Sequence, residues 1–427
     1  MFPNPQDALP LPQRPNLERY KKLAKELVKA CKSGDAEAIR NWSEKWVTAV
    51  AKLSGVKFTR RLPVATQRWI DEVEDFAQRK LLSSVGRKCA LTDAQFVIAR
   101  SHGFPGWPKL AEHIEALRRK DSVVAQFEAA ADAIATGDAA TLKRLLAANP
   151  QLARARSTRE HGATLLHYCS ANGVEGYRQK TPKKIVKITE LLLRAGAEVD
   201  AEADVYGGGA TALGLAATSV HPETAGVQNE LLQLLLDHGA SLERSSAAGN
   251  RHRVVKGCLA NGRGPAAEFL ASRGAPLDLE EAAGAGRLDV VKTFFNAEGS
   301  LKNATKEQMQ AGFGWACEYG HRNVVEFLIE KGVDLRAQSH GETGLHWAAV
   351  GGELETVKLL VARGAPLEEK NSYDGTVLSQ ALWSAFNGPK PGHLAVVEFL
   401  IAAGAKVDPE WQPWIDKLRR RDGPSRE

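Results

Sequence analysis

The sequence has no apolar run of the ~18–20 residues that a membrane-spanning helix requires, so a helical membrane protein is not expected. Its opening, MFPNPQDALPLPQRP, lacks the basic-then-apolar pattern of a secretory signal peptide. A Gly-x-Ser-x-Gly motif is absent, and the triple glycine at 207–209 lacks the Lys-Ser/Thr of a phosphate-binding loop. We therefore expect a cytoplasmic protein that is not an enzyme.

Residues that form disulfides or bind metals are scarce. The chain has five cysteines, far apart and without a Cys-x-x-Cys pair, which is typical of a reduced compartment. His102 and His113 have no Cys or carboxylate pattern beside them, so we expect neither a metal nor a cofactor. We expect buried, unreactive thiols at Cys31, Cys89, Cys169, Cys258 and Cys317.

Charge is unevenly distributed along the chain, whose net charge is +6. Residues 1–120 carry 23 Lys and Arg against 13 Asp and Glu, whereas residues 121–408 carry 29 against 34. One interpretation of this basic head is an ordinary solvated helical surface. The other is attraction to nucleic acid or to another acidic partner.

Residues 341–368, GETGLHWAAVGGELETVKLLVARGAPLE, predict two short antiparallel helices. Thr343 is suited to cap the first helix, because its hydroxyl accepts a backbone N–H that has no partner within the helix. Leu345 and Ala348 then fall on one face. Gly364 supplies the left-handed residue that ends the second helix at little steric cost. One such hairpin cannot bury its apolar face alone, so copies are needed on both sides.

The copies are present. A leucine-rich run followed by Gly-Ala or a close variant recurs seven times, at intervals scattered about the roughly 33 residues of one known repeat class. The opening signature recurs as ATLLH (163–167), ATALG (210–214), TGLHW (343–347) and GTVLS (375–379). The closing glycines are Gly196, Gly239, Gly274, Gly299, Gly332, Gly364 and Gly404.

These two signatures resemble the ankyrin repeat over residues 122–408. The resemblance implies an all-α solenoid of about eight helix pairs that binds proteins. It also implies that His167 and His346 bond backbone groups and stiffen neighbouring units. The sequence departs from the family pattern because the proline that follows threonine is replaced in all four openings, by Leu165, Ala212, Gly344 and Val377.

The remaining residues predict three further segments. Residues 1–15 carry five prolines and are expected to form an extended or disordered arm. Residues 16–120 are expected to form a helical module. Through LTDAQFVIAR (91–100) and GFPGWPKL (103–110) it resembles a module found ahead of ankyrin repeats in bacterial proteins, which implies a bacterial origin. Residues 409–427 are expected to be a C-terminal cap and tail, with Trp411 and Trp414 covering the last helix pair.

Spacing within the repeats predicts where loops are longer or shorter than usual. Extra residues near 174–184, in SVHPETAGVQ and in FNGPKPGH should fall between the two helices of a unit. Gly274 and Gly299 are only 25 residues apart. We therefore expect the unit between them to lack the finger loop that joins successive helix pairs.

Aromatic side chains supply the candidate site. In ankyrin repeats the residue after the His position faces the concave side, and here several such positions are aromatic. One interpretation is a continuous partner-binding groove, since exposed aromatics are typical binding hot spots. The other is that the rings pack between adjacent first helices. The groove candidates are Tyr168, Trp315, Tyr319, Trp347 and Trp383, with Tyr206, His340, Glu342 and Tyr373 at the finger tips together with Arg159 and His161.

The sequence thus predicts a monomeric, non-catalytic scaffold or adaptor that binds a protein partner through its groove and fingers. It predicts no membrane association, and nucleic acid is not expected as the partner. The alternative function is nucleic-acid or acidic-surface binding by the basic head, with the repeats as a spacer.

Overall fold

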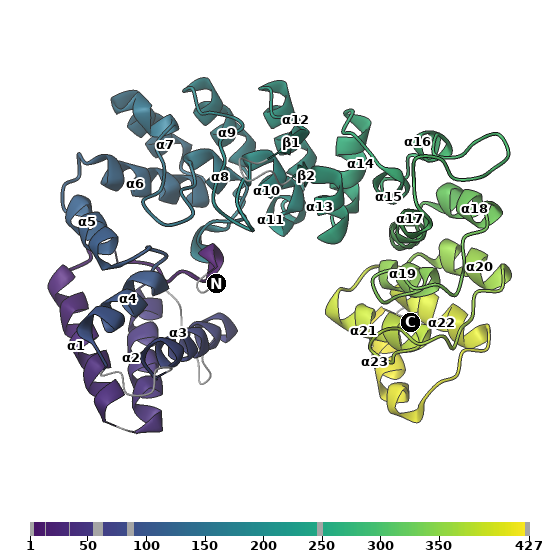
Figure 1. The fold of residues 1–427 in the computed structure, drawn as a ribbon, viewed down its shortest axis with the longest axis horizontal. Coiled ribbons are helices and arrows are strands. Elements are labelled where there is room, and N and C mark those ends of the chain that lie inside the picture. The colour runs from purple at the N-terminus through teal and green to yellow at the C-terminus, as the bar shows by residue number, and fades with distance from the viewer. Residues whose placement is uncertain are drawn as a thin grey trace. The chain divides into compact units, whose positions relative to one another are not determined.

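The computed structural model describes residues 4–12, 14–33, 35–53, 63–82, 89–245 and 251–422 (Figure 1). The chain divides into two compact units, Met1–His252 and Arg253–Glu427. The expected all-α class is confirmed, with the addition of one two-stranded sheet, β1 (Glu243–Ser245) and β2 (Arg251–Arg253). Within the described ranges, no helix combines the length and the apolar character needed to cross a lipid bilayer.

The first unit begins with a five-helix head around its own apolar core. Asn16 starts the first helix by accepting a hydrogen bond from the Glu18 amide at 2.8 Å, as its side chain is suited to do. Leu27, Trp46 and Ile98 lie in the core of the head, contributed by three different helices. The head helices are α1 (Leu17–Lys32), α2 (Ala36–Leu53), α3 (Val64–Leu82), α4 (Leu91–Ser101) and α5 (Trp107–Leu117).

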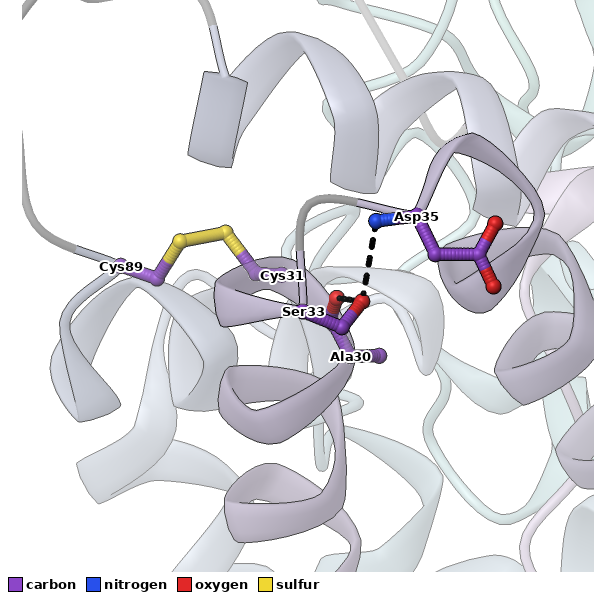
Figure 2. The surroundings of a disulfide bond; sticks show 5 residues. All are labelled: Ala30, Cys31, Ser33, Asp35 and Cys89. Carbon is purple, nitrogen blue, oxygen red and sulfur yellow. Dashed lines mark hydrogen bonds between the residues drawn. A yellow bond between two sulfur atoms is a disulfide. The ribbon is translucent and has the colours of Figure 1, made fainter.

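A disulfide joins Cys31, at the end of α1, to Cys89, just before α4 (Figure 2). The prediction of five free thiols is therefore wrong for this pair. The two residues are far apart in the sequence, and only the packing of α1 against α4 brings them together. The other three cysteines, Cys169, Cys258 and Cys317, are free and buried as expected.

Residues 4–12, called the arm below, are folded onto the first unit. The arm contains a short 3-10 helix, η1 (Pro5–Asp7), and the segment from Asp7 to Pro10 is buried. Beyond η1 the arm has the extended backbone that its prolines predicted, but it is buried against the unit and not disordered. The physical reason is that Ala8 and Leu9 are apolar and find a matching surface on the rest of the unit.

After the head, the first unit continues as helix pairs stacked side by side (Figure 1). The first helices α6, α8 and α10 form one row, and the second helices α7, α9 and α12 form another. The two predicted insertions of this unit lie between the helices of a pair and carry short helices of their own, η3 and α11. The elements are α6 (Val123–Thr136), α7 (Ala139–Ala148), η2 (Pro150–Ala153), α8 (Leu165–Cys169), η3 (Gly176–Arg178), α9 (Ile185–Arg194), α10 (Ala212–Thr218), α11 (Val220–Thr224) and α12 (Gln228–Asp237).

The second unit repeats the arrangement, which brings the described helix pairs to the predicted eight. Its first helices α15, α17, α19 and α21 contact one another in sequence order. The pairs are α13 (Val254–Ala260) with α14 (Gly264–Ser272), α15 (Leu279–Gly284) with α16 (Leu288–Lys292), α17 (Lys306–Glu318) with α18 (Arg322–Glu330), α19 (Gly344–Gly351) with α20 (Leu354–Ala362), and α21 (Val377–Asn387) with α22 (His393–Ala402).

The pair α19 and α20 begins and ends at the residues that the sequence predicted. Thr343 accepts a hydrogen bond from the His346 amide, and Gly364 has a φ of +85°. The predicted absence of a finger is also confirmed. Helix α14 ends at Ser272 and α15 already begins at Leu279, whereas α18 ends at Glu330 and α19 begins only at Gly344.

The chain closes with η4 (Pro409–Trp411) and α23 (Gln412–Asp422), which pack against the last pair. Ile415 and Leu418 are the buried residues of α23. Trp414 is 43% exposed, but its ring lies edge-on to that of Phe386 in α21, with centroids 5.0 Å apart, and Trp411 packs against the apolar core of the last pairs. The two tryptophans therefore cover part of the last pair, as predicted.

Candidate partner-binding surface

Glycines allow the first helices of the second unit to approach closely enough for tryptophans to pack between them. A Cβ atom on Gly314 of α17 would lie 2.9 Å from the Trp347 ring of α19. A Cβ atom on Gly284 of α15 would lie 2.9 Å from the Cβ of Trp315 in α17. Trp347 through its ring and Trp315 through its Cβ therefore occupy space that the preceding helix leaves empty.

Four of the predicted groove and finger residues form one aromatic cluster. The Trp315 ring centroid lies 6.3 Å from that of Tyr319, 5.5 Å from that of His340 and 5.7 Å from that of Trp347. Trp315 is only 8% exposed and its Nε1 donates to Glu280 Oε1 at 3.1 Å. Trp315 therefore packs between adjacent first helices, as the alternative interpretation predicted, and forms the buried base of the cluster.

The outer members of the cluster are half-buried or exposed. Tyr319 donates to the Leu259 carbonyl at 2.7 Å, and Trp347 Nε1 donates to the Ser339 carbonyl at 3.1 Å. These bonds fix both rings, and both residues are half-buried. His340 is exposed and has a φ of +54°, a left-handed conformation that is uncommon outside glycine.

A cleft of about 880 Å³ adjoins His340. It lies between the loop at 299–301, the first turn of α17 and the finger loop at 331–340. Its wall combines Phe295 and Met309 with the charged side chains of Lys306, Lys331 and Asp334, so it presents both apolar surface and hydrogen-bonding groups.

Tyr373 and Trp383 are the most exposed of the predicted residues in this unit, at 86% and 58%. Tyr373 is at the tip of the finger loop that precedes α21. Asn371 holds this loop in shape, because its Oδ1 accepts from the Tyr373 amide at 3.0 Å and from the Gly375 amide at 2.8 Å. Its Nδ2 lies 3.1 Å from Gln380 Oε1, which ties the loop to α21, the helix that carries Trp383.

Glu342 was expected on the polar rim, but it is 6% exposed, so that expectation is wrong. Its Oε1 accepts from Asn371 Nδ2 at 2.9 Å, so it joins two successive finger loops. Burial raises its pKa to about 7. Asn371 is the functional residue that the sequence analysis missed. Its signal was present in the Asn-Ser-Tyr-Asp-Gly turn at 371–375, because Asn and Asp side chains commonly bond the backbone of such turns.

Among the candidates in the first unit, only Tyr206 is on the surface, with 61% exposure. Its hydroxyl lies 2.8 Å from Asn172 Oδ1 and 3.0 Å from Gln6 Oε1 of the arm. Tyr168 is fully buried, with its ring 5.9 Å from that of Phe127, so it does not line a surface groove.

Arg159 and His161 were also expected at a finger tip, and both are buried. Arg159 forms ion pairs with Glu128 at 2.6 Å and with Glu175 at 2.8 Å, and Arg178 pairs with Glu128 at 2.8 Å. Burial opposes ionisation of Glu128, but the two guanidinium groups outweigh it and lower its pKa to about 2. This ionic cluster connects α6 to the insertion at 174–184.

The predicted histidine role is confirmed. His167 Nε2 lies 3.1 Å from the Ala210 carbonyl and His346 Nε2 lies 3.2 Å from the Gly375 carbonyl, each in the opening segment of the next unit. Burial lowers the pKa of both imidazoles to about 4, so they are neutral near pH 7. His321 and His393 make similar bonds to Gly284 and Val350, which the sequence pattern did not reveal.

Within the described part of the chain, no group of three or more His, Cys, Asp or Glu side chains is placed to hold a metal ion. The family model for ankyrin repeats in three copies matches residues 279–374 and again residues 315–410. These ranges hold α15 to α22, including the aromatic cluster, Tyr373 and Trp383. No curated protein matches the chain.

Proposed function

Because the C-terminal part of this chain consists of ankyrin repeats, we propose that the protein is a non-catalytic scaffold or adaptor that binds a protein partner there. The proposed contact surface is formed by the finger loops at 331–343 and 363–376 and the exposed face of α21. The observation that carries the proposal is the exposure of Trp383 and Tyr373 on adjoining segments of one repeat. Large exposed aromatics of this kind bury much area on binding at low entropic cost.

The rest of the proposed surface adds further aromatic, apolar and charged groups that a protein partner can contact. His340 and the half-buried Trp347 and Tyr319 extend the aromatic area over two more repeats. The cleft beside His340 offers a partner side chain both apolar wall and charge. Asp374, at the same tip as Tyr373, adds a carboxylate to the rim. The ankyrin array generally serves protein–protein interaction, which agrees with this surface.

The Cys31–Cys89 disulfide bears on the cellular compartment of the protein. A cytoplasmic location was expected from the sequence, but a disulfide such as Cys31–Cys89 is rare in cytosolic proteins and favours an oxidising compartment. Mass spectrometry of the protein purified from its source under thiol-blocking conditions distinguishes the two. A blocked thiol at both cysteines supports the cytoplasm, and an intact disulfide supports an oxidising compartment.

Nucleic-acid binding by the basic head is less well supported than the repeat surface. Several head cations already pair with carboxylates, for example Arg40 with Glu74 at 2.7 Å and Arg79 with Asp75 at 2.7 Å. A salt titration separates the alternatives, because binding to phosphates weakens steeply with salt while binding through an aromatic surface changes little.

We expect Trp383→Ala and Tyr373→Ala, combined in one chain, to abolish capture of the partner from a lysate of the source organism. The matched control is Leu82→Ala, which removes an apolar side chain of similar exposure (57%) at the end of α3 in the head, outside the proposed surface. Captured proteins are compared by quantitative mass spectrometry. A protein that is retained by the unmodified chain and the control but reduced at least tenfold by the double variant supports the proposal. Equal capture by all three chains rules it out.

A further inference from the structure

The arm is bound to the first unit in the way that peptide-binding proteins hold an extended ligand. Two of its contacts are made through its backbone. The Leu9 amide donates to the Ser101 carbonyl at 2.7 Å, and the Leu9 carbonyl accepts from His102 Nδ1 at 2.9 Å. Paired main-chain bonds of this kind are the usual source of affinity when a protein recognises an extended segment.

His102 is built to make this contact. It is fully buried, and its ring lies edge-on to the rings of Tyr20 and Trp46, with centroids 5.3 and 5.6 Å away. Burial lowers its pKa to about 4, so the imidazole is neutral near pH 7. Its Nδ1 must then carry the proton that the Leu9 carbonyl accepts, and its Nε2 has no hydrogen-bond partner.

Glycines border the arm on either side, and one of them, Gly176, leaves space that the arm occupies. A Cβ atom on Gly176 would lie 2.5 Å from the Gln6 carbonyl oxygen, and a Cβ atom on Gly103 would lie 3.4 Å from the Ala8 side chain. Gly176 belongs to the insertion at 174–184, whereas Gly103 belongs to the turn after α4. The arm thus lies between the head and the first repeats of the same unit.

The side chains of the arm add specificity. Ala8 and Leu9 are each 1% exposed, and Leu9 enters the apolar core of the head. Asp7 pairs with Arg68 at 2.8 Å, and the Gln6 amide oxygen faces the Tyr206 hydroxyl at 3.0 Å. A ligand of this surface therefore needs an acidic residue followed by a small residue and leucine.

Only a short stretch of the arm is buried, and two of its anchors are exposed. Asp7 to Pro10 are buried, but Arg68 is 57% exposed and Tyr206 is 61% exposed. Prolines on both sides of the buried stretch limit the conformational freedom that is lost on binding. A competing segment therefore has few contacts of the arm to break. If it carries the same prolines, it loses little conformational entropy when it binds.

We propose that Arg68, Ser101, His102, Gly103, Gly176 and Tyr206 form a peptide-binding site that the arm fills in cis. The site accepts an extended segment of a partner protein with the sequence Asp-Ala-Leu-Pro or a close variant. Such a segment enters by displacing the arm. This site is separate from the ankyrin surface of the second unit, so either one can be present without the other.

The test uses the full chain with Leu9→Asp, which weakens the arm because a carboxylate cannot remain buried among apolar side chains. The probe is a dye-labelled synthetic peptide, NPQDALPLP, which copies residues 4–12, and binding is followed by fluorescence anisotropy. We expect saturable binding to the Leu9→Asp chain. Binding to the unmodified chain should be at least ~10-fold weaker, because its own arm competes at an effective concentration of the order of millimolar.

Three controls make the result specific. The peptide carrying Asp in place of the leucine that copies Leu9 should not bind the Leu9→Asp chain. Adding Gly176→Val to that chain should abolish binding, because the new side chain occupies the space of the Gln6 carbonyl. Adding Gly214→Ala instead should leave binding unchanged, since only Thr211 Oγ1, at 3.6 Å, lies near that position.

Circular dichroism establishes whether the variant is folded. If the Leu9→Asp chain loses its helical signal, Leu9→Ala replaces it and the same measurements apply. A folded variant that does not bind the peptide, or that binds both peptides equally, overturns the proposal. Loss of folding in both variants also overturns it, because the arm would then be an integral core segment and not a displaceable ligand.

Discussion

At the scale of single residues, burial places several carboxyl groups where their ionisation is costly. Glu318, near the end of α17, is 8% exposed, and burial raises its pKa to about 7. The unfolded chain releases this proton near the ordinary value of 4.5. The folded state therefore binds more protons than the unfolded state between these two values, and folding stability falls as the pH rises through that window.

We expect Glu318→Gln to stabilise the protein at pH 8 by about 3 kcal/mol, because the amide removes the cost of a buried charge while keeping the shape. At pH 4 the parent side chain is already neutral, so the two proteins should be equally stable. Urea unfolding at both pH values measures the difference.

The matched control is Glu355→Gln on α20. Glu355 is exposed, and its hydrogen bond and ion pair with Lys358 lower its pKa, so its neutralisation should bring no gain at pH 8. A stabilisation by Glu318→Gln that is the same at pH 4 and pH 8 would contradict the titration argument.

At the scale of elements, close approach between first helices depends on glycine. A Cβ atom on Gly351, at the end of α19, would overlap the Glu318 carbonyl oxygen of α17. We expect Gly351→Ala to lower the free energy of unfolding by about 1–3 kcal/mol, as overpacking of a well-packed contact does. Thermal unfolding followed by circular dichroism measures the change.

Gly214→Ala in α10 is the control for Gly351→Ala. Gly214 is also inside a first helix, but its added methyl group meets only ordinary contact distances. Alanine should therefore stabilise that helix by up to about 1 kcal/mol, since it restricts the unfolded chain more than glycine does. Equal effects of the two substitutions would show that the close contact at Gly351 carries no cost.

The elements could be predicted from sequence because their signals are local. Thr343, Gly364 and the phased leucines depend only on neighbours within a few residues, and they define a helix pair wherever they recur. The missing finger followed from the spacing of two glycines. The fold class, the number of helix pairs and the positions of the insertions could all be predicted in this way.

Exposure of the site residues could not be predicted, because it depends on segments far away in the sequence. Arg159 is buried since the insertion at 174–184 brings Glu175 and Arg178 over it. Glu342 is buried since Asn371 of the next finger covers it. Repeat spacing assigns a residue to a position within the helix pair. It does not show whether an insertion or a neighbouring finger loop covers the side chain at that position.

At the scale of the whole molecule, the head and the last four helix pairs have separate apolar cores. The disulfide lies in the first unit alone and links residues 58 positions apart. We expect its removal by Cys31→Ser with Cys89→Ser to lower the free energy of unfolding of the first unit by about 2–4 kcal/mol, largely through the larger freedom of the unfolded chain.

Hydrogen exchange in increasing urea, read by mass spectrometry, reports the two units separately. The peptides of the first unit should lose protection at lower urea in the double variant, and those of α17 to α22 should not change. An equal shift in both units would contradict the assignment of the disulfide effect to the first unit. Finding five alkylated thiols in the unreduced parent would refute the disulfide itself.

The binding of the arm has a consequence for biosynthesis. Tyr206, which contacts Gln6 of the arm, is translated 200 residues after it. At about 5–20 residues per second, the ribosome needs roughly 10–40 s to cover that distance. During this interval the nascent chain can bring Leu9 to the completed head, but the repeat side of its site does not yet exist, so the arm becomes fully bound only when the first unit is almost complete.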